Sequence, residues 1–288
     1  MYKRQIQHLP HVGTTLPKTW VDVRQKLEEL AANNNNYITL DHYLEICTNN
    51  GFDNYENALQ LSQYLHDLGV CLHFQEDSLL SKTVILQPEW GTDAVYKVLD
   101  DNTVIRNLGK FNKQDLNKIW CDSKYQRMHN ELLQLMIKFK LCYQISHQKN
   151  HYIAPQLLTL NQPEYNWDEN NNLLLRYKYE FMPKGILTRF IVEMHQDIYK
   201  DYVWRNGVVL IDNYAQAEII EYYEKKEIRI RISGNNKRDL MIIITNEIDK
   251  INDSYDRIKY NKLIPCNCPT CRSKTEPCLL YTSPSPRD

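Results

Sequence analysis

Apolar side chains recur at helical spacing near the start of the chain. One stripe of them comprises Trp20, Val23, Leu27 and Leu30. Because these positions are three or four residues apart, they share one side of an α-helix and predict a helix with a single buried face. Pro17 suits the first turn of this helix, since the amide hydrogen that proline lacks would be unpaired there.

Capping residues delimit the next two helices. Thr39 and either Asp53 or Asn54 can accept hydrogen bonds from the first backbone amides of a helix. Gly51 and Gly69 can end these helices, because glycine adopts the left-handed backbone conformation at little cost. The sequence therefore predicts two helices that each have a start signal and a stop signal.

Short strands surround these helices. Residues 37–39 read as one strand, and alternating apolar residues over 70–74 and 84–86 predict two more, joined by a loop. The resulting order is helix, strand, helix, helix and a pair of strands. This is the order of a winged-helix domain.

The same order of elements then repeats. A helix from about Glu89, a strand at 104–105 and helices through Leu116 and Leu132 precede two strands that turn at 148–150. No obvious residue-level identity links the two halves. The repeat is therefore one of element order only.

The period of the pattern changes after residues 162–172, which are polar and predict a linker. Alternating apolar residues over 173–181 and 228–232 predict strands with one buried face. Helical spacing returns over 187–198 and 240–251. This part of the chain therefore combines strands with two helices.

Asn206-Gly207 lies between two short apolar segments and favours a tight β-hairpin, in which both loop residues would take positive φ. We therefore predict an α+β fold for the chain. Two tandem winged-helix-like units would occupy residues 6–161, and an α+β domain with an antiparallel sheet would occupy 173–265.

Composition narrows the function. The 35 Lys and Arg residues balance 36 Asp and Glu residues, so the net charge of -1 gives no general attraction to nucleic acid or anionic lipid. Only 8 glycines are present, and the phosphate-binding pattern G-x-x-x-x-G-K-[ST] is absent. No apolar run approaches the ~20 residues of a membrane span, and no signal peptide opens the chain, so we expect a cytoplasmic protein without a catalytic site.

Winged helices often bind DNA through their third helix, with help from basic side chains. The first candidate helix, 54–68, contains Glu56 and Asp67 but no Lys or Arg. The second, around 124–140, mixes both charges. These helices favour contacts with protein, and we do not expect a nucleic-acid partner.

Four cysteines gather over residues 266–278: Cys266, Cys268, Cys271 and Cys278. Thiolates at this spacing can share a tetrahedral zinc ion, although structural zinc sites usually use two separated Cys-x-x-Cys pairs. Free or buried thiols are the alternative reading. No other cofactor is expected in this chain.

Aromatic side chains dominate the energetics of protein interfaces. Trp90, Trp120 and Trp204 are therefore the candidate interface residues, although the sequence does not tell a buried tryptophan from an exposed one.

The two ends of the chain resemble translated sequencing adapters. These segments are residues 1–5 and 279–288. We expect both to be adapter-derived, so that the natural protein would run past each end and the cysteine-rich segment 266–278 would be truncated.

Several stretches, in this order, resemble the COR domain of Roco proteins. They are LPKTW (16–20), YLHDLGV (64–70), VILQPEW (84–90), YIAP (152–155), FMPKG (181–185) and RFI (189–191). The resemblance covers nearly everything between residues 6 and 278.

The resemblance implies a set of partners. In that family a Ras-like GTPase domain, Roc, precedes COR, and COR packs on it and mediates homodimerisation that regulates the GTP cycle. Some members also carry leucine-rich repeats or a protein kinase. GTP and magnesium would be bound by the Roc domain of the parent protein. Two other functions stay open, a winged-helix DNA-binding regulator and an interaction adaptor without a GTPase.

Overall fold

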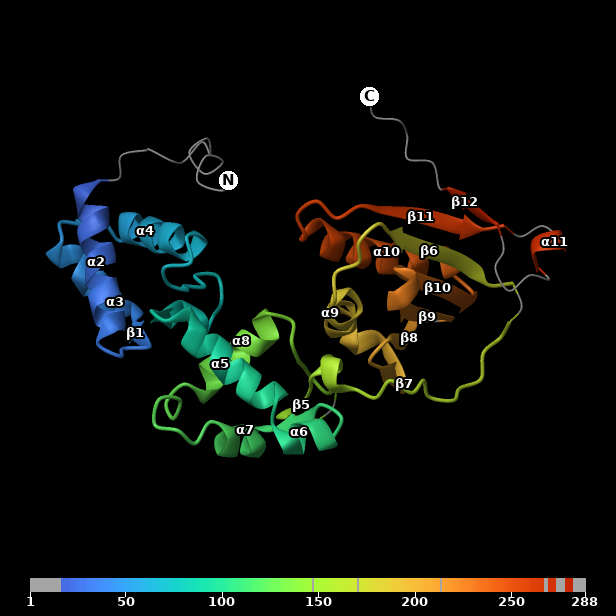
Figure 1. The fold of residues 1–288 in the computed structure, drawn as a ribbon, viewed down its shortest axis with the longest axis horizontal. Coiled ribbons are helices and arrows are strands. Elements are labelled where there is room, and N and C mark those ends of the chain that lie inside the picture. The colour runs from blue at the N-terminus through green and yellow to red at the C-terminus, as the bar shows by residue number, and fades with distance from the viewer. Residues whose placement is uncertain are drawn as a thin grey trace, which may run out of the picture. The chain divides into compact units, whose positions relative to one another are not determined.

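The computed structural model describes residues 17–146, 148–169, 171–212, 214–266, 269–272 and 278–281. Helices and antiparallel sheets make the fold α+β, as predicted (Figure 1). The chain forms two compact units. One contains the residues up to Lys97 together with Trp120–Leu135, and the other contains Val98–Ile119 with the residues from Met136 onward. None of the described helices is both long and apolar enough to cross a lipid bilayer.

The first elements follow the predicted order. They are α2 (Lys18–Ala32), β1 (Tyr37–Thr39), α3 (Leu40–Asn49), α4 (Tyr55–Asp67), the 3₁₀ turn η1 (Leu80–Lys82), β2 (Thr83–Ile85) and α5 (Pro88–Leu99). Strands β1 and β2 pair antiparallel. The strand predicted over 70–74 is reduced to one bridge between Leu72 and Ile85, and the chain then turns, where the Asp77 amide donates to the carbonyl of Phe74 at 3.1 Å.

The predicted caps are present. The Thr39 hydroxyl accepts a hydrogen bond from the His42 amide at 3.2 Å, and Asn54 accepts one from the Glu56 amide at 2.8 Å. Asn54, and not Asp53, is therefore the cap of α4. Gly51 and Gly69 both have positive φ, which explains glycine at the two helix ends.

The next elements along the chain are three helices and the strands of a small sheet. They are α6 (Asn102–Arg106), β3 (Lys110–Asn112), α7 (Lys113–Ile119), α8 (His129–Lys138), β4 (Tyr143–Gln144) and β5 (His151–Ile153), with sheet order β3-β5-β4. The strand predicted at 104–105 is wrong, since these residues lie in α6. The Asp101 side chain accepts hydrogen bonds from the amides of Thr103 and Val104 and so starts a helix there.

The C-terminal half contains a seven-stranded antiparallel sheet of order β12-β11-β6-β10-β9-β8-β7. Its strands are β6 (Leu173–Tyr179), β7 (Ile198–Trp204), β8 (Gly207–Asp212), β9 (Ala215–Tyr222), β10 (Glu227–Gly234), β11 (Tyr260–Pro265) and β12 (Leu279–Tyr281). Strand β12 takes its residues from the segment expected to be adapter-derived. The remaining short elements are η2 (Pro155–Leu157), η3 (His195–Asp197), η4 (Tyr223–Lys225) and α11 (Pro269–Arg272).

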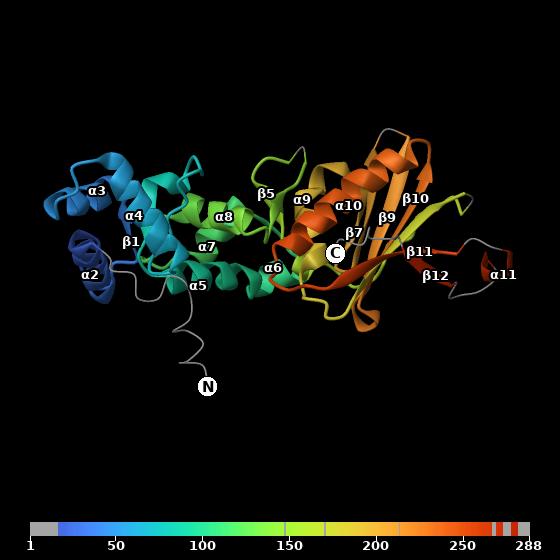
Figure 2. The ribbon, with the colours of Figure 1, turned by 90° about the horizontal axis from the view of Figure 1, so that it is seen from above.

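Helices α9 (Ile186–Glu193) and α10 (Lys237–Asp253) lie side by side over one face of this sheet (Figure 2). Their apolar stripes pack against the inward side chains of the strands, including Tyr177, Ile219 and Ile230, to form the core of this half. Helix α9 ends earlier than the predicted 198, because the His195 ring donates to the carbonyl of Val192 at 2.8 Å and the chain turns into β7.

The predicted hairpin joins β7 to β8, but one position earlier than expected. Trp204 pairs with Gly207, so the two loop residues are Arg205 and Asn206. Gly207 does not have the positive φ that the pattern predicted. A Cβ atom on Gly207 would lie 2.0 Å from Cζ2 of Trp204. Glycine is therefore required by the close approach of the indole ring.

Candidate interaction surfaces

The tryptophans predicted to contact a partner all lie inside the protein. Trp90, Trp120 and Trp204 are 4%, 0% and 2% exposed. The indole nitrogen of Trp120 donates to the carbonyl of Ala94 at 2.9 Å, and that of Trp90 donates to the carbonyl of Lys124 at 3.2 Å. Buried indoles with paired N–H groups act as core residues, so surfaces for a partner must be sought elsewhere.

Two of the cysteines in the predicted zinc site are joined by a backbone hydrogen bond. Cys266 directly follows β11 and Cys278 directly precedes β12, and the Cys266 amide donates to the carbonyl of Cys278 at 2.7 Å. Cys271 is buried in α11, and Cys268 lies outside the described residues. Within the described part of the chain, no three Cys, His, Asp or Glu residues are grouped so that they could hold a metal ion. Zinc binding stays a prediction, which metal analysis of the purified protein would test.

A serine and a histidine meet in the core of the first compact unit. His73 Nδ1 lies 2.9 Å from the Ser62 hydroxyl, and Nε2 donates to the carbonyl of Ser81 at 2.9 Å. Both side chains are sealed from solvent, at 0% and 1% exposure for Ser62 and His73. Burial lowers the pKa of His73, which favours a neutral ring. The pair is out of reach of any substrate and holds the chain after α4 in place.

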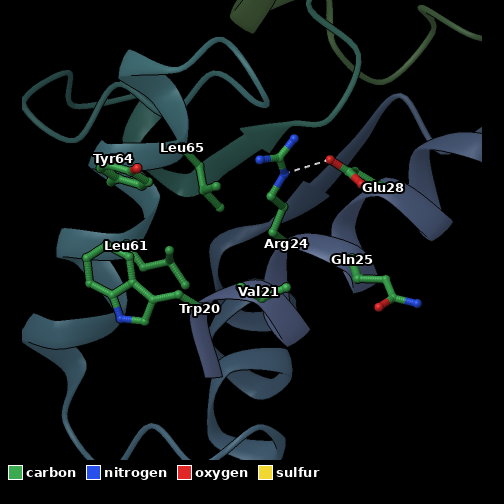
Figure 3. Close-up of a pocket in the computed structure, with 8 residues that line it drawn as sticks. All are labelled: Trp20, Val21, Arg24, Gln25, Glu28, Leu61, Tyr64 and Leu65. Carbon is green, nitrogen blue, oxygen red and sulfur yellow. Dashed lines mark hydrogen bonds and ion pairs between the residues drawn. The ribbon is translucent and has the colours of Figure 1, made fainter. Parts of the chain in front are cut away.

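A groove opens between α2 and α4 (Figure 3). We call it the α2–α4 groove, and its lining residues are Trp20, Val21, Arg24, Gln25, Glu28, Leu61, Tyr64 and Leu65. Leu61 and Leu65 form its floor and are fully buried, whereas Val21 on its wall is 46% exposed. The cavity volume is about 310 Å³.

The two ends of this groove differ in chemistry. At one end the rings of Trp20 and Tyr64 are tilted against each other with centroids 5.3 Å apart. At the other end Arg24 Nε donates to Glu28 at 2.7 Å, so the two charges neutralise each other (Figure 3). The groove can therefore accept apolar side chains from a segment of either net charge.

A second surface lies on the face of the seven-stranded sheet opposite α9 and α10. We call it the outer sheet face. A hollow of about 330 Å³ there is lined in part by Leu174, Arg176, Tyr222 and Pro265. The Arg229 guanidinium lies 4.5 Å from the centre of the Tyr222 ring and donates to Glu227 at 2.7 Å.

Part of the predicted linker packs on the outer sheet face. The Tyr165 hydroxyl donates to Glu218, which also accepts a hydrogen bond from Arg231 at 2.8 Å. The Arg231 guanidinium lies 4.6 Å from the centre of the Trp167 ring and pairs with Glu169 at 3.0 Å. Residues 162–169 are thus anchored to the sheet, although they contain no helix or strand.

Sequence reasoning missed both surfaces. The only local signal for the α2–α4 groove was Val21, an apolar residue directly outside the predicted stripe of α2. For the outer sheet face the signal was Leu174, an apolar residue at an outward position of β6. A single apolar residue on a surface is ordinary, so neither position stood out before the elements were assembled.

Comparison with known proteins identifies the chain's relatives. Two family models match it, "C-terminal of Roc, COR-A domain" over residues 17–158 and "C-terminal of Roc, COR-B domain" over residues 170–283. A Roc-COR-CHAT protease of Runella zeae is 30% identical over 85% of this chain and 26% of its own length. The probable serine/threonine-protein kinase pats1 of Dictyostelium discoideum is 22% identical over 91% of this chain and 9% of its own length.

A solved structure is also similar, that of Methanosarcina barkeri Roco2 RocCORdC bound to GDP. It is 29% identical, covers 54% of this chain and 48% of that chain, and has a TM-score of 0.47. The present chain thus spans only a fraction of the relatives that it matches. The two family models lie in tandem and leave few residues unmatched, and the chain therefore belongs to the COR domain family of Roco proteins.

Proposed function

We propose that this chain is a non-catalytic COR module of a Roco protein, which packs on an upstream Roc GTPase domain and mediates homodimerisation that regulates the GTP cycle. The tandem match to COR-A and COR-B carries this proposal. The name of one relative, a Roc-COR-CHAT protease, supports it. Because the chain has no phosphate-binding pattern, nucleotide would be bound by the Roc domain.

The two halves of the chain would have separate partners. The first half would pack on the Roc domain, and the second half would contact a second copy of the chain. The outer sheet face suits a second copy, because it presents apolar, aromatic and charged groups of both signs. A two-fold interface joins a surface to itself, and a face whose Arg229 and Arg231 are paired with Glu227 and Glu218 does not repel its own copy.

Regulation would follow from linked equilibria. If the nucleotide changes how the Roc domain packs on COR, it can change the dimerisation constant by some factor. Dimerisation then changes the nucleotide affinity by that same factor. A coupling free energy of ~1–3 kcal/mol corresponds to roughly a 5- to 150-fold change in affinity. No chemical step within this chain is needed.

Sedimentation velocity over a wide range of protein concentrations tests the dimer. We expect reversible association of the chain, weakened by Leu174→Glu, which places a charge at the hollow of the outer sheet face. Ile242→Glu is the matched control, because Ile242 is also an exposed apolar residue but lies on α10 over the opposite face. A strict monomer at the highest concentration would contradict dimerisation by this chain. Loss of association with Ile242→Glu alone would place the interface on the helical face.

A further inference from the structure

The α2–α4 groove has an apolar floor and an open mouth. Its floor residues, Leu61 and Leu65, belong to the core of the first compact unit and are fixed by it. Val21 at the mouth is 46% exposed, and Leu68, just beyond the end of α4, is 52% exposed. The groove is thus a rigid apolar site next to accessible apolar surface, and covering it would remove that surface from water.

The size of the groove fits protein side chains. Its volume of about 310 Å³ is at the lower end for small-molecule sites, which typically span ~300–1,000 Å³. Two helices form its walls, as in the grooves that receive the apolar face of a partner helix. We therefore take the occupant to be a segment of protein.

The chemistry along the groove defines that segment further. The aromatic end, with Trp20 and Tyr64, suits a large apolar side chain. The polar end, with Arg24 and Glu28, lies one to two turns further along α2 and suits a polar side chain. An amphipathic helix presents such residues three or four positions apart on one face.

The position of the groove in the chain identifies the partner. The COR-A match begins at residue 17 and α2 begins at Lys18. A polypeptide that arrives from an N-terminal domain therefore enters beside the aromatic end of the groove, since Trp20 and Val21 lie in the first turn of α2. A domain tethered so closely has a high effective concentration at this site.

We propose that the α2–α4 groove is the site where the upstream Roc domain docks, through apolar side chains of an amphipathic helix. This inference rests on the proposed function, which supplies the Roc domain, and adds the surface and the chemistry of the contact. The groove then couples the GTPase to COR because a nucleotide-dependent shift of that helix would change how well its side chains fill the groove.

Val21→Glu tests the contact. The probe is the Roc domain encoded immediately upstream, produced separately and loaded with GDP, and its affinity for the 288-residue chain is measured by calorimetry. The introduced carboxylate would be buried unpaired in an apolar contact, so we expect Val21→Glu to weaken binding at least ~10-fold, which equals about 1.4 kcal/mol. Lys26→Glu is the matched control, because Lys26 is exposed on α2 but does not line the groove.

The outcomes separate the inference from the proposed function. No binding of the Roc domain by the wild-type chain would overturn the proposed packing on Roc. Wild-type binding that Val21→Glu leaves unchanged, or that Lys26→Glu weakens equally, would overturn the groove alone. Loss of self-association in Val21→Glu, with Roc binding intact, would assign the groove to a second copy of the chain.

A photo-crosslinking experiment keeps the test independent of the glutamate substitution. p-Benzoylphenylalanine placed at Val21 of the longer Roc-COR protein should crosslink to the Roc domain, whereas the same group at Lys26 should not. Crosslinks from position 21 that map only outside the Roc domain would contradict the inference, even if the glutamate variant were poorly folded.

Discussion

Replacing Gly207 with alanine should destabilise the C-terminal half by about 1–3 kcal/mol, the usual range for overpacking a well-filled core. The new Cβ would lie 2.0 Å from Cζ2 and 2.4 Å from Cε2 of Trp204, which is only 2% exposed. A rigid indole held at this depth has no free volume to move into, so either the ring or the β7–β8 hairpin must shift. The backbone itself tolerates alanine, because Gly207 lies outside the left-handed region.

Urea unfolding, followed by far-UV circular dichroism, measures this change. A Trp204→Val background removes the ring and should make Gly207→Ala nearly neutral, although Trp204→Val is itself costly. Gly91→Ala in α5 is the control, since its Cβ would meet Leu135 at an ordinary 3.6 Å and alanine favours a helix. An equal cost of Gly207→Ala with and without the indole would refute the steric explanation and point to the backbone.

Two further predictions concern the N-terminal half. Asp101→Ala should lower stability by about 0.5–2 kcal/mol by removing the cap of α6, whereas Asp100→Ala, without a capping bond in the structure, should stay within about 0.5 kcal/mol in urea unfolding. Burial holds the pKa of His73 below the ordinary value of 6.5, so the unfolded state binds a proton more readily than the folded state. The contribution of the neutral ring to the free energy of unfolding is complete above about pH 6.5 and is lost as the pH falls through the folded pKa. We expect His73→Gln to make the urea midpoint less dependent on pH in this range. An unchanged pH dependence of the midpoint would show that other groups cause it.

Helices could be predicted where local signals decide them. The stripe of α2 and the caps Thr39 and Asn54 are each set by residues within a few positions, and the structure confirms them. The strand predicted at 104–105 is wrong because Val104 and Ile105 favour a strand by side-chain shape, whereas the Asp101 cap three positions before Val104 starts a helix. Here the capping hydrogen bonds of Asp101 outweigh the intrinsic strand propensity of the two residues.

Long-range pairing explains most of what the sequence did not reveal. Strand β9 places small Ala215 and Ala217 inward, which gives a weak alternation, and its partners are set by the sheet as a whole. The sequence predicts glycine at position 207 through a positive φ, whereas the actual requirement is the close approach of the Trp204 ring, which exists only in the folded protein. The α2–α4 groove and the outer sheet face likewise join residues that are distant in sequence.

The proposed function requires this chain to transmit the nucleotide state through contacts alone. The most direct test is the dimerisation constant of the longer Roc-COR protein, measured by analytical ultracentrifugation with GDP and then with a non-hydrolysable GTP analogue. We expect the two constants to differ by the same factor by which dimerisation changes the relative affinity for the two nucleotides. Identical dimerisation constants in the two nucleotide states would contradict the account.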